Sequence, residues 1–513
     1  MLTALSALVA AFSVLPVVFL VTQAAGLGTR RAVRLLAQSH LPALLGSTAE
    51  IVVAGALLSA VVGTATAWLV ERTDLPGRRI WRAALAAPLA VPAFVASYAW
   101  SSLTSVVQGF AGALLITTLS LFPLVHLPVS AALRASDAAL LESARSMGLR
   151  PWQVFRRVEV PRLRHALLGG TLLVAVRLLS EFGAFEMLRY RTFTTAIYDQ
   201  FQVSFDGPGT DLLSLVLVLC CVALLTTEAA MRGRGHGRIT ATGSGAVRPA
   251  PPHRLGRPAA AGAQLSLALL LGAAVGVPLA TLAVWLVRGA SSAFPVRELA
   301  AALAQTVGLG LLTGLFTTVL AFPVALLAIR RGGWIGWALE RLTYLSHALP
   351  GIAIALALVF ATTHYADGLY QTLPLLVVAY AAKFLPRAQT AVRAALAQSP
   401  ERYTEAARAA GSRPVGALLR VTLPLIAPGL AAALAMLFLS AATELTATLL
   451  LAPIGVQTLA TQVWQNVSSL AYGAAAPYAL LIIAISAPVT WLLHRTGLSE
   501  AATDSLPVRE GTT

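Results

Sequence analysis

The chain has 513 residues, of which 57% are hydrophobic and only 11% are charged. Soluble domains carry about 25% charged residues, so this composition excludes an ordinary soluble enzyme, a disordered chain and a collagen-like chain. No charged residue occurs from Ala83 to Leu133 or from Leu445 to His494, and each stretch is long enough to cross a bilayer twice. The sequence therefore predicts an all-α polytopic membrane protein.

The net charge of +16 comes almost entirely from arginine, because Lys383 is the single lysine. In a soluble protein such a basic excess would suggest a nucleic-acid partner. Here the arginines gather in short loops between apolar runs, which is typical of the cytoplasmic loops of membrane proteins. We therefore expect the lipid bilayer, and no nucleic acid, as a partner.

Apolar runs that end at charges or at Gly and Pro turns predict about twelve transmembrane helices. They lie near residues 4–26, 48–70, 83–104, 110–133, 164–185, 209–230, 263–287, 302–329, 342–363, 368–392, 425–447 and 472–494. Residues 231–262 carry six arginines and no acid, with many Gly and Pro residues, so they predict a basic cytoplasmic linker that buries no core. Six crossings on each side of this linker place both termini in the cytoplasm.

An internal repeat supports this division of the chain. A shift of 263 residues places ten residues of segment 136–161 on identical residues of segment 399–424, without a gap. The matched pairs are Ser136/Ser399, Glu142/Glu405, Ala144/Ala407, Arg145/Arg408, Gly148/Gly411, Arg150/Arg413, Pro151/Pro414, Arg157/Arg420, Val158/Val421 and Pro161/Pro424. Six crossings return the chain to its starting side, so the copies form two parallel six-helix repeats. We expect transmembrane domains at 1–230 and 263–496, the linker between them, and a cytoplasmic tail at 497–513.

The repeated segment has the pattern of a short helix, a tight turn and a second short helix. A glycine stands where helices commonly end in a left-handed residue, one proline can start the second helix, and another marks the start of the next span. These residues are Gly148, Pro151 and Pro161 in the first copy and Gly411, Pro414 and Pro424 in the second.

The spacing of a Glu-Ala-Ala triplet, a glycine six residues after the Glu and a proline thirteen residues beyond that glycine resembles the EAA loop of ABC importer permeases. The first copy differs by one residue, since it reads Glu142-Ser143-Ala144. In that family the loop is a coupling helix received by cytoplasmic ATPase subunits. The resemblance therefore implies an ATPase-coupling role for Glu142, Ala144, Gly148, Arg150, Pro161, Glu405, Ala407, Gly411, Arg413 and Pro424.

This resemblance also implies a fold, partners and a location. We expect the fold of a type I ABC importer permease, which moves its substrate by alternating access in the bacterial plasma (inner) membrane. The implied partners are two copies of a cytoplasmic ABC ATPase subunit and an extracytoplasmic substrate-binding protein. A Walker A loop needs Gly-Lys-Ser/Thr, whereas Lys383 lies between Ala382 and Phe384. ATP and magnesium are therefore expected on the partner ATPases, with no cofactor, catalytic residue or firm metal site on this chain.

Most permeases of this class consist of two chains, and a fused pair resembles the importers of ferric iron, thiamine and aminoethylphosphonate. The segments that follow the two loops, 181–198 and 444–461, look like those of ferric iron permeases. Ferric iron is therefore the expected substrate, with thiamine and aminoethylphosphonate as alternatives. A secondary transporter of major facilitator type is a distant alternative, because it shares the 6+6 arrangement but has no reason to repeat the loop motif.

Four oxygen-bearing side chains are candidates for the translocation pathway: Glu181, Glu444, Tyr190 and Tyr198. Ferric ion is hard and favours carboxylate and phenolate oxygen, and an ionisable group at membrane depth suggests a pathway or an ion-pair partner. We place both glutamates late in the fifth span of each repeat. Arg177, four residues before Glu181, offers it an internal ion pair, whereas the matching residue in the second repeat is Ser440. The sequence thus predicts no such partner for Glu444.

Overall fold

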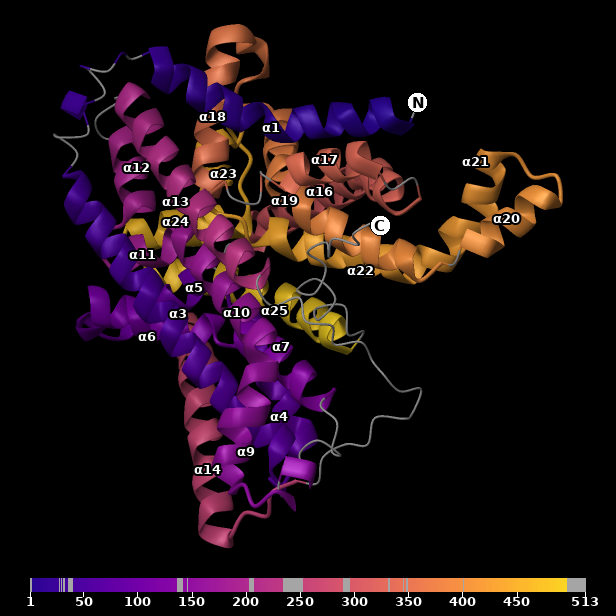
Figure 1. The fold of residues 1–513 in the computed structure, drawn as a ribbon. Helices are drawn as coiled ribbons and strands as arrows, with labels where there is room; N and C mark the ends of the chain where they lie inside the picture. The colour runs from indigo at the N-terminus through magenta and orange to yellow at the C-terminus, as the bar shows by residue number, and fades with distance from the viewer. Residues whose placement is uncertain are drawn as a thin grey trace. The chain divides into compact units, whose positions relative to one another are not determined.

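The computed structural model describes residues 2–26, 28, 30, 33–35, 40–135, 142–144, 146–202, 207–233, 252–288, 296–330, 333–344, 346, 349–399 and 401–495 (Figure 1). Within these ranges the chain is helical and forms no strand; Thr73 and His253 make an isolated β-bridge. The prediction of an all-α chain is therefore confirmed.

The first half of the chain contributes eleven of the described α-helices. They are α1 (Leu2–Gly26), α3 (Leu41–Arg72), α4 (Arg78–Ala84), α5 (Ala93–Leu103), α6 (Phe110–Leu121), α7 (Pro123–Arg134), α9 (Pro151–Val154), α10 (Val160–Leu179), α11 (Gly183–Met187), α12 (Phe193–Gln202) and α13 (Gly207–Gly233). The second half contributes α14 (Arg257–Leu271), α15 (Val277–Arg288), α16 (Val296–Arg330), α17 (Gly333–Tyr344), α18 (Gly351–Tyr365), α19 (Leu373–Ala397), α20 (Glu401–Ala409), α21 (Pro414–Ala417), α22 (Leu423–Ala442), α23 (Thr446–Leu451), α24 (Leu459–Ser468) and α25 (Tyr472–Arg495).

Eight helices in the described part of the chain are long and apolar enough to cross a membrane. A ninth crossing is obtained if the bent pair Arg78–Ala90 and Ala93–Leu103 counts as one span. Each of the twelve predicted spans contains a helix, but α10, α18 and α19 do not meet this criterion. Helix α18 has only 15 residues, and α10 and α19 each carry three lysine or arginine residues. The polytopic prediction is confirmed, and the number of twelve crossings stays a prediction.

Helix contacts divide the chain into two compact units, which do not coincide with the two repeats. Unit 1 comprises Met1–Leu41, Ala196–Val218 and Trp285–Thr513, and unit 2 comprises Pro42–Thr195 and Leu219–Val284. In unit 1, α1 packs on α16, α17 and α18 of the second half (Figure 1). In unit 2, Leu267 of α14 packs in a cluster with Val70 of α3. The first helix of each repeat is thus built into the unit of the other repeat.

The two units repeat the same helix pairs. Helix α7 packs on α10 and α5 on α11 in unit 2, as α19 packs on α22 and α18 on α23 in unit 1. Small residues bring the backbones together, since a Cβ at Gly170 would lie 2.8 Å from the Leu124 carbonyl oxygen. A Cβ at Gly429 would lie 2.6 Å from Ala395 Cβ. Close packing at small residues is how membrane helices associate when burial from water contributes little.

The predicted linker is helical at both of its ends. Helix α13 continues to Gly233, and α14 begins at Arg257 after an extended Gly256, with Pro258 in its first turn. The prediction that this segment buries no core is wrong for its last residues, because Leu255 packs against a buried cluster. Residues 234–251 of the linker, and the predicted tail at 497–513, lie outside the described residues.

Candidate functional site

The first repeat loop (residues 136–161) contains a tight turn between two helical segments of unit 2. Residues 136–141 and Arg145 lie outside the described residues, and Glu142 to Ala144 are helical. Ala144 is buried against Val154, whereas Glu142 and Arg150 are exposed. Gly148 has a φ of 83°, so the predicted left-handed turn is confirmed.

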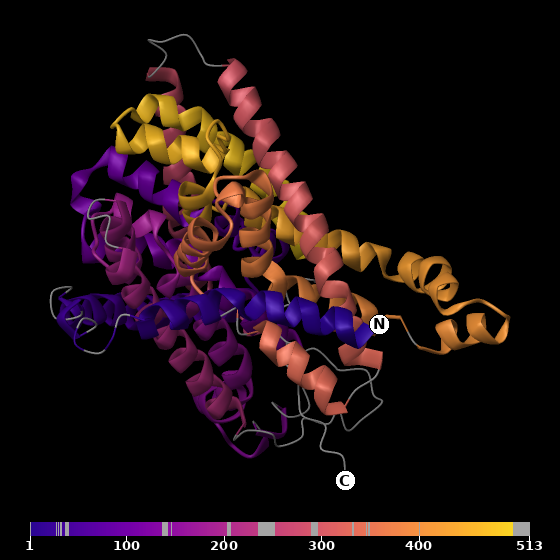
Figure 2. The same cartoon turned by 90° about the horizontal axis from the view of Figure 1, so that it is seen from above.

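The second repeat loop (residues 399–424) builds the same turn in unit 1. Helix α20 precedes it and α21 follows it, and the two form a projection at the end of α22 in both views (Figures 1 and 2). Gly411 has a φ of 87°, and Arg413 lies in extended backbone just before α21. Glu405 is exposed and Ala407 is partly buried. Both copies therefore present their glutamate to the surrounding medium and turn their alanine inward.

The hydrogen bonds of the two turns match residue for residue. Leu149 N–H donates to the Ala144 carbonyl at 3.3 Å, and Ser412 N–H donates to the Ala407 carbonyl at 3.0 Å. A bond across six residues that closes over a left-handed glycine is the Schellman ending of a helix. Because the same ending occurs twice, the repeat is one of conformation as well as of sequence.

A π-helical turn lies near the end of each loop, a feature that the sequence interpretation missed. It covers Phe155–Glu159 in the first repeat and Leu418–Thr422 in the second. The second short helix therefore continues through this turn into the next span, and Pro161 and Pro424, both exposed, are each the second residue of α10 and α22. A proline inside a helix clashes with the carbonyl four residues earlier, which here belongs to the π turn. The two prolines were thus the sequence signal for these turns.

An arginine at the end of a neighbouring helix holds each π turn. In unit 2, Arg72 Nε lies 2.6 Å from Glu159 Oε1, and both side chains are only 5% exposed. In unit 1, Arg330 Nη2 donates to Thr404 Oγ1 at 2.9 Å and to Thr422 Oγ1 at 3.4 Å. Glu159 and Thr422 are the last residues of the two π turns. The same position is therefore tied to the preceding long helix by an ion pair in one repeat and by neutral acceptors in the other.

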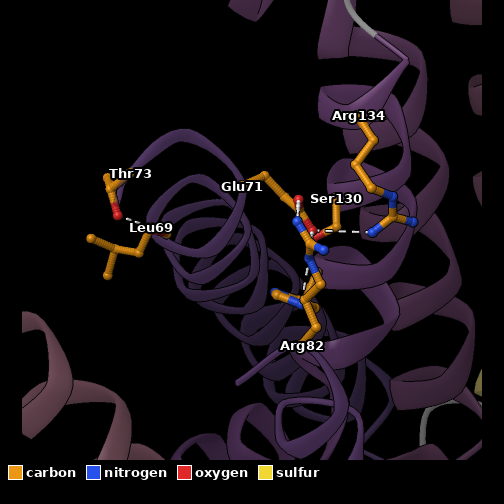
Figure 3. Close-up of polar contacts among 7 residues, drawn as sticks. Leu69, Glu71, Thr73, Arg82, Ser130 and Arg134 are labelled. Atoms are coloured by element: carbon orange, nitrogen blue, oxygen red, sulfur yellow. Dashed lines mark hydrogen bonds and ion pairs between the residues drawn. The ribbon is translucent and has the colours of Figure 1, made fainter. Parts of the chain in front are cut away.

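A second ion cluster joins the helix ends beside the first repeat loop. Glu71 at the end of α3 accepts hydrogen bonds from Arg82 Nε at 2.9 Å and Nη2 at 2.5 Å, and from Arg134 Nη1 at 3.1 Å (Figure 3). In unit 1 a buried Glu340 on α17 pairs with Arg393 on α19. Paired and hydrogen-bonded carboxylates of this kind fix helix ends relative to one another.

The two predicted glutamates lie in equivalent helix breaks rather than within the fifth spans. Helix α10 ends at Leu179 and α22 at Ala442, so Glu181 and Glu444 fall in the breaks before α11 and α23. Glu181 Oε1 accepts the Ala184 N–H at 3.1 Å, and Glu444 Oε1 accepts the Ala447 N–H at 3.2 Å. Each carboxylate therefore stabilises the first turn of the short helix that follows it.

Glu444 has no charged partner four residues earlier in the chain, as predicted, but it is paired with a lysine from another helix. Lys383 of α19 places its Nζ 2.5 Å from Glu444 Oε2, and the two side chains are only 15% and 9% exposed. Ser440 stands four residues before Glu444, so the cation comes from α19 and not from the preceding turn. Gly351 makes room for this pair, since a Cβ there would lie 2.5 Å from Lys383 Nζ.

The two tyrosine candidates have contacts of their own. Tyr190 donates from its hydroxyl to the Ser47 carbonyl at 2.8 Å and lies 3.4 Å from Glu50 Oε2. Tyr198 packs edge-on against Trp464 with ring centroids 6.1 Å apart. No group of three or more His, Cys, Asp or Glu residues lies together in the part of the chain that the structure describes. The pathway role of the four candidates stays a prediction.

The phenol of Tyr190 is expected to remain protonated far above neutral pH. Burial, and then the nearby Glu50 carboxylate, raise its pKa to about 12 from an ordinary value of 10.0. Since the unfolded chain would lose this proton first, the stability from the neutral phenol is complete below pH 10 and is lost between pH 10 and 12. A titration at 295 nm, taken as wild type minus Tyr190→Phe, should show phenolate only near pH 12; a midpoint near 10 would contradict this environment.

Comparison with known proteins identifies a family. The family described as "Binding-protein-dependent transport system inner membrane component" matches residues 55–229 and again residues 318–496. The chain is 37% identical over 485 residues to the Fe(3+)-transport system permease protein FbpB 2 of Haemophilus influenzae, covering 94% of this chain and 95% of that protein. It is 28% identical over 196 residues to the molybdenum transport system permease protein ModB of Escherichia coli, covering 34% of this chain and 85% of the relative.

Both family matches include one repeat loop, its π turn and the helix break that follows. The ModB likeness covers about one third of this chain but most of the relative, as expected if one repeat corresponds to one whole ModB chain. The chain therefore belongs to the family of binding-protein-dependent transport system inner membrane components and carries the family domain twice.

Proposed function

We propose that the chain is the fused permease subunit of an ATP-driven importer of ferric iron. The observation that supports the transport mechanism is the repeat loop, built twice with the same left-handed glycine, the same Schellman bond and the same π turn. The likeness to an Fe(3+)-transport permease over 94% of the chain supports the substrate. One ATPase subunit would dock on each repeat loop, giving two copies for each permease chain.

The repeat loops have the chemistry to receive another protein. The second loop carries a surface hollow whose lining includes Gly411, Arg413 and Arg420. Short helices around a basic hollow fit a groove with acidic and apolar groups on a partner. The ATP and magnesium would be bound by that partner, and both termini of this chain would face the same cytoplasmic side.

Alternating access would follow from these contacts. Closure of two ATPase subunits around ATP pulls the loops together, and the arginine ties at Glu159 and Thr422 pass the displacement to α3 and α16. An external binding protein would deliver the iron. For transport to proceed, the iron-loaded binding protein must bind one conformation of the permease more tightly than the other.

Uptake of radioactive ferric iron tests this proposal. Cells that lack the chain should regain uptake when wild type is supplied, and uptake should require a functional partner ATPase. Thiamine and aminoethylphosphonate uptake are measured in parallel. Restoration of thiamine or aminoethylphosphonate uptake without iron uptake would overturn the assignment of ferric iron as the substrate. The family and the role of the loops would be unaffected.

A further inference from the structure

The end of the linker forms a short extended segment, residues 253–255, that docks on the end of α3; we call it the strap. His253 N–H donates to the Arg72 carbonyl at 2.7 Å, and Asp74 N–H donates to the His253 carbonyl at 3.1 Å. These bonds make the isolated parallel bridge between Thr73 and His253. The strap therefore binds the backbone on both sides of Thr73.

Side chains on both partners add to this backbone pairing. Leu255 N–H donates to Asp74 Oδ1 at 2.7 Å, which is a charge-assisted bond. The His253 ring stacks on Trp68, with centroids 6.0 Å apart and an interplanar angle of 27°. Leu255 packs against the cluster that contains Val70. Backbone, polar and apolar contacts thus converge on the last turn of α3.

The residue held by the strap is also the residue that holds the first repeat loop. Arg72 gives its backbone carbonyl to His253, while its buried side chain lies 2.6 Å from Glu159 in the π turn. A displacement of the strap must therefore move the Arg72 backbone, and with it the partner of Glu159. Strap, helix end and loop are connected in series through one residue.

The second repeat has a different arrangement. Arg330 ends α16 and reaches the hydroxyls of Thr404 and Thr422, and among the described residues the bridge at Thr73 is the one extended pairing. The two loops, although alike in their turns, are supported differently.

We propose that the strap is a positioning element for the first repeat loop and sets how tightly that loop follows the partner ATPase. The inference rests on the proposed function, because coupling to ATP is what the loop would do. Its basis is the chain of contacts from His253 and Leu255 to Arg72 and on to Glu159. The linker is then more than a connection between repeats, since its last residues support a coupling surface.

The test uses the complete reconstituted complex in proteoliposomes. Asp74→Ala removes the acceptor of the Leu255 N–H, and the ATP hydrolysed for each iron imported should rise about fivefold, the change expected for one lost hydrogen bond of ordinary strength. Asp74→Asn keeps an acceptor oxygen at the same place and should restore the wild-type ratio. Asp367→Ala, which changes an exposed acid outside the strap and both loop segments, is the matched control.

A second measurement separates this inference from the proposed function. Affinity of the purified permease for the ATPase subunit needs no substrate, and Asp74→Ala should weaken it while Asp74→Asn does not. In a Glu159→Ala background the effect of Asp74→Ala should nearly vanish, because the acceptor for the Arg72 side chain has already been removed. Equal effects in both backgrounds, or an unchanged affinity and ratio in Asp74→Ala, would overturn the strap's role. Failure of the wild-type protein to import iron would instead refute only the assignment of ferric iron as the substrate.

Discussion

Valine at Gly148 or Gly411 is expected to lower iron uptake about tenfold while ATP hydrolysis continues. Both glycines have a φ above 80°, where a β-branched residue costs on the order of 1–3 kcal/mol. An added Cβ would meet nothing within 4 Å at either position, so the cost arises from the backbone of the turn and not from a clash. The loop would therefore leave its docked shape while the helices around it stay packed. Uptake and ATP hydrolysis are measured on the same proteoliposomes.

Two further variants give this prediction its controls. Gly333 also has a positive φ, of 75°, with open space around it, but it lies outside both repeat loops. Gly333→Val should therefore lose similar stability and keep normal coupling. Gly411→Asn should retain most uptake, because asparagine tolerates the left-handed conformation. Equal uncoupling by Gly333→Val would show that strain anywhere in the chain, rather than the loop turn, is responsible.

Lys383→Met is expected to be the most destabilising single change among those considered. It leaves the Glu444 carboxylate buried without its cation, and breaking a buried ion pair from one side costs about 3–5 kcal/mol. The double variant Lys383→Met/Glu444→Gln should recover most of that loss, because the neutral amide keeps an oxygen for the Ala447 N–H. Unfolding of the purified protein in mixed detergent micelles measures both variants.

Transport by the same double variant distinguishes a structural role from a pathway role of Glu444. If the carboxylate contacts iron in passage, the double variant is stable but imports slowly, and this is the result that we expect. Glu181→Gln is the equivalent change in the first repeat, where the carboxylate makes the same bond to the following short helix. A stable double variant with wild-type import would remove Glu444 from the pathway. A Lys383→Met variant as stable as wild type would show that the ion pair contributes nothing to the free energy of unfolding.

Local patterns in the sequence predicted the helices and the loop turns, because both depend on neighbouring residues. Apolar runs located helices, and the spacing around Gly148 and Gly411 predicted left-handed turns that the structure confirms. The π turns also had a local signal, in the prolines at 161 and 424, but that signal was interpreted only as a helix start.

Contacts between distant residues could not be predicted from these patterns. Lys383 and Glu444 are 61 residues apart, and their pairing depends on how α19 packs on α22. The strap and Asp74 are separated by 181 residues, and composition alone favoured an unstructured linker there. In each case the partner lies in a distant segment of the chain, at a separation that no periodicity in a single sequence encodes.

The first helix of each repeat packs in the unit formed mainly by the other repeat, and this affects the order in which the helices can pack. Helix α1 is synthesised long before its packing partners α16, α17 and α18, which begin only at Val296. Helix α14, by contrast, finds unit 2 already present when it emerges. Helix α1 must therefore remain without these partners while the intervening part of the chain is synthesised. A single fused chain also guarantees that the two repeats are made in equal numbers.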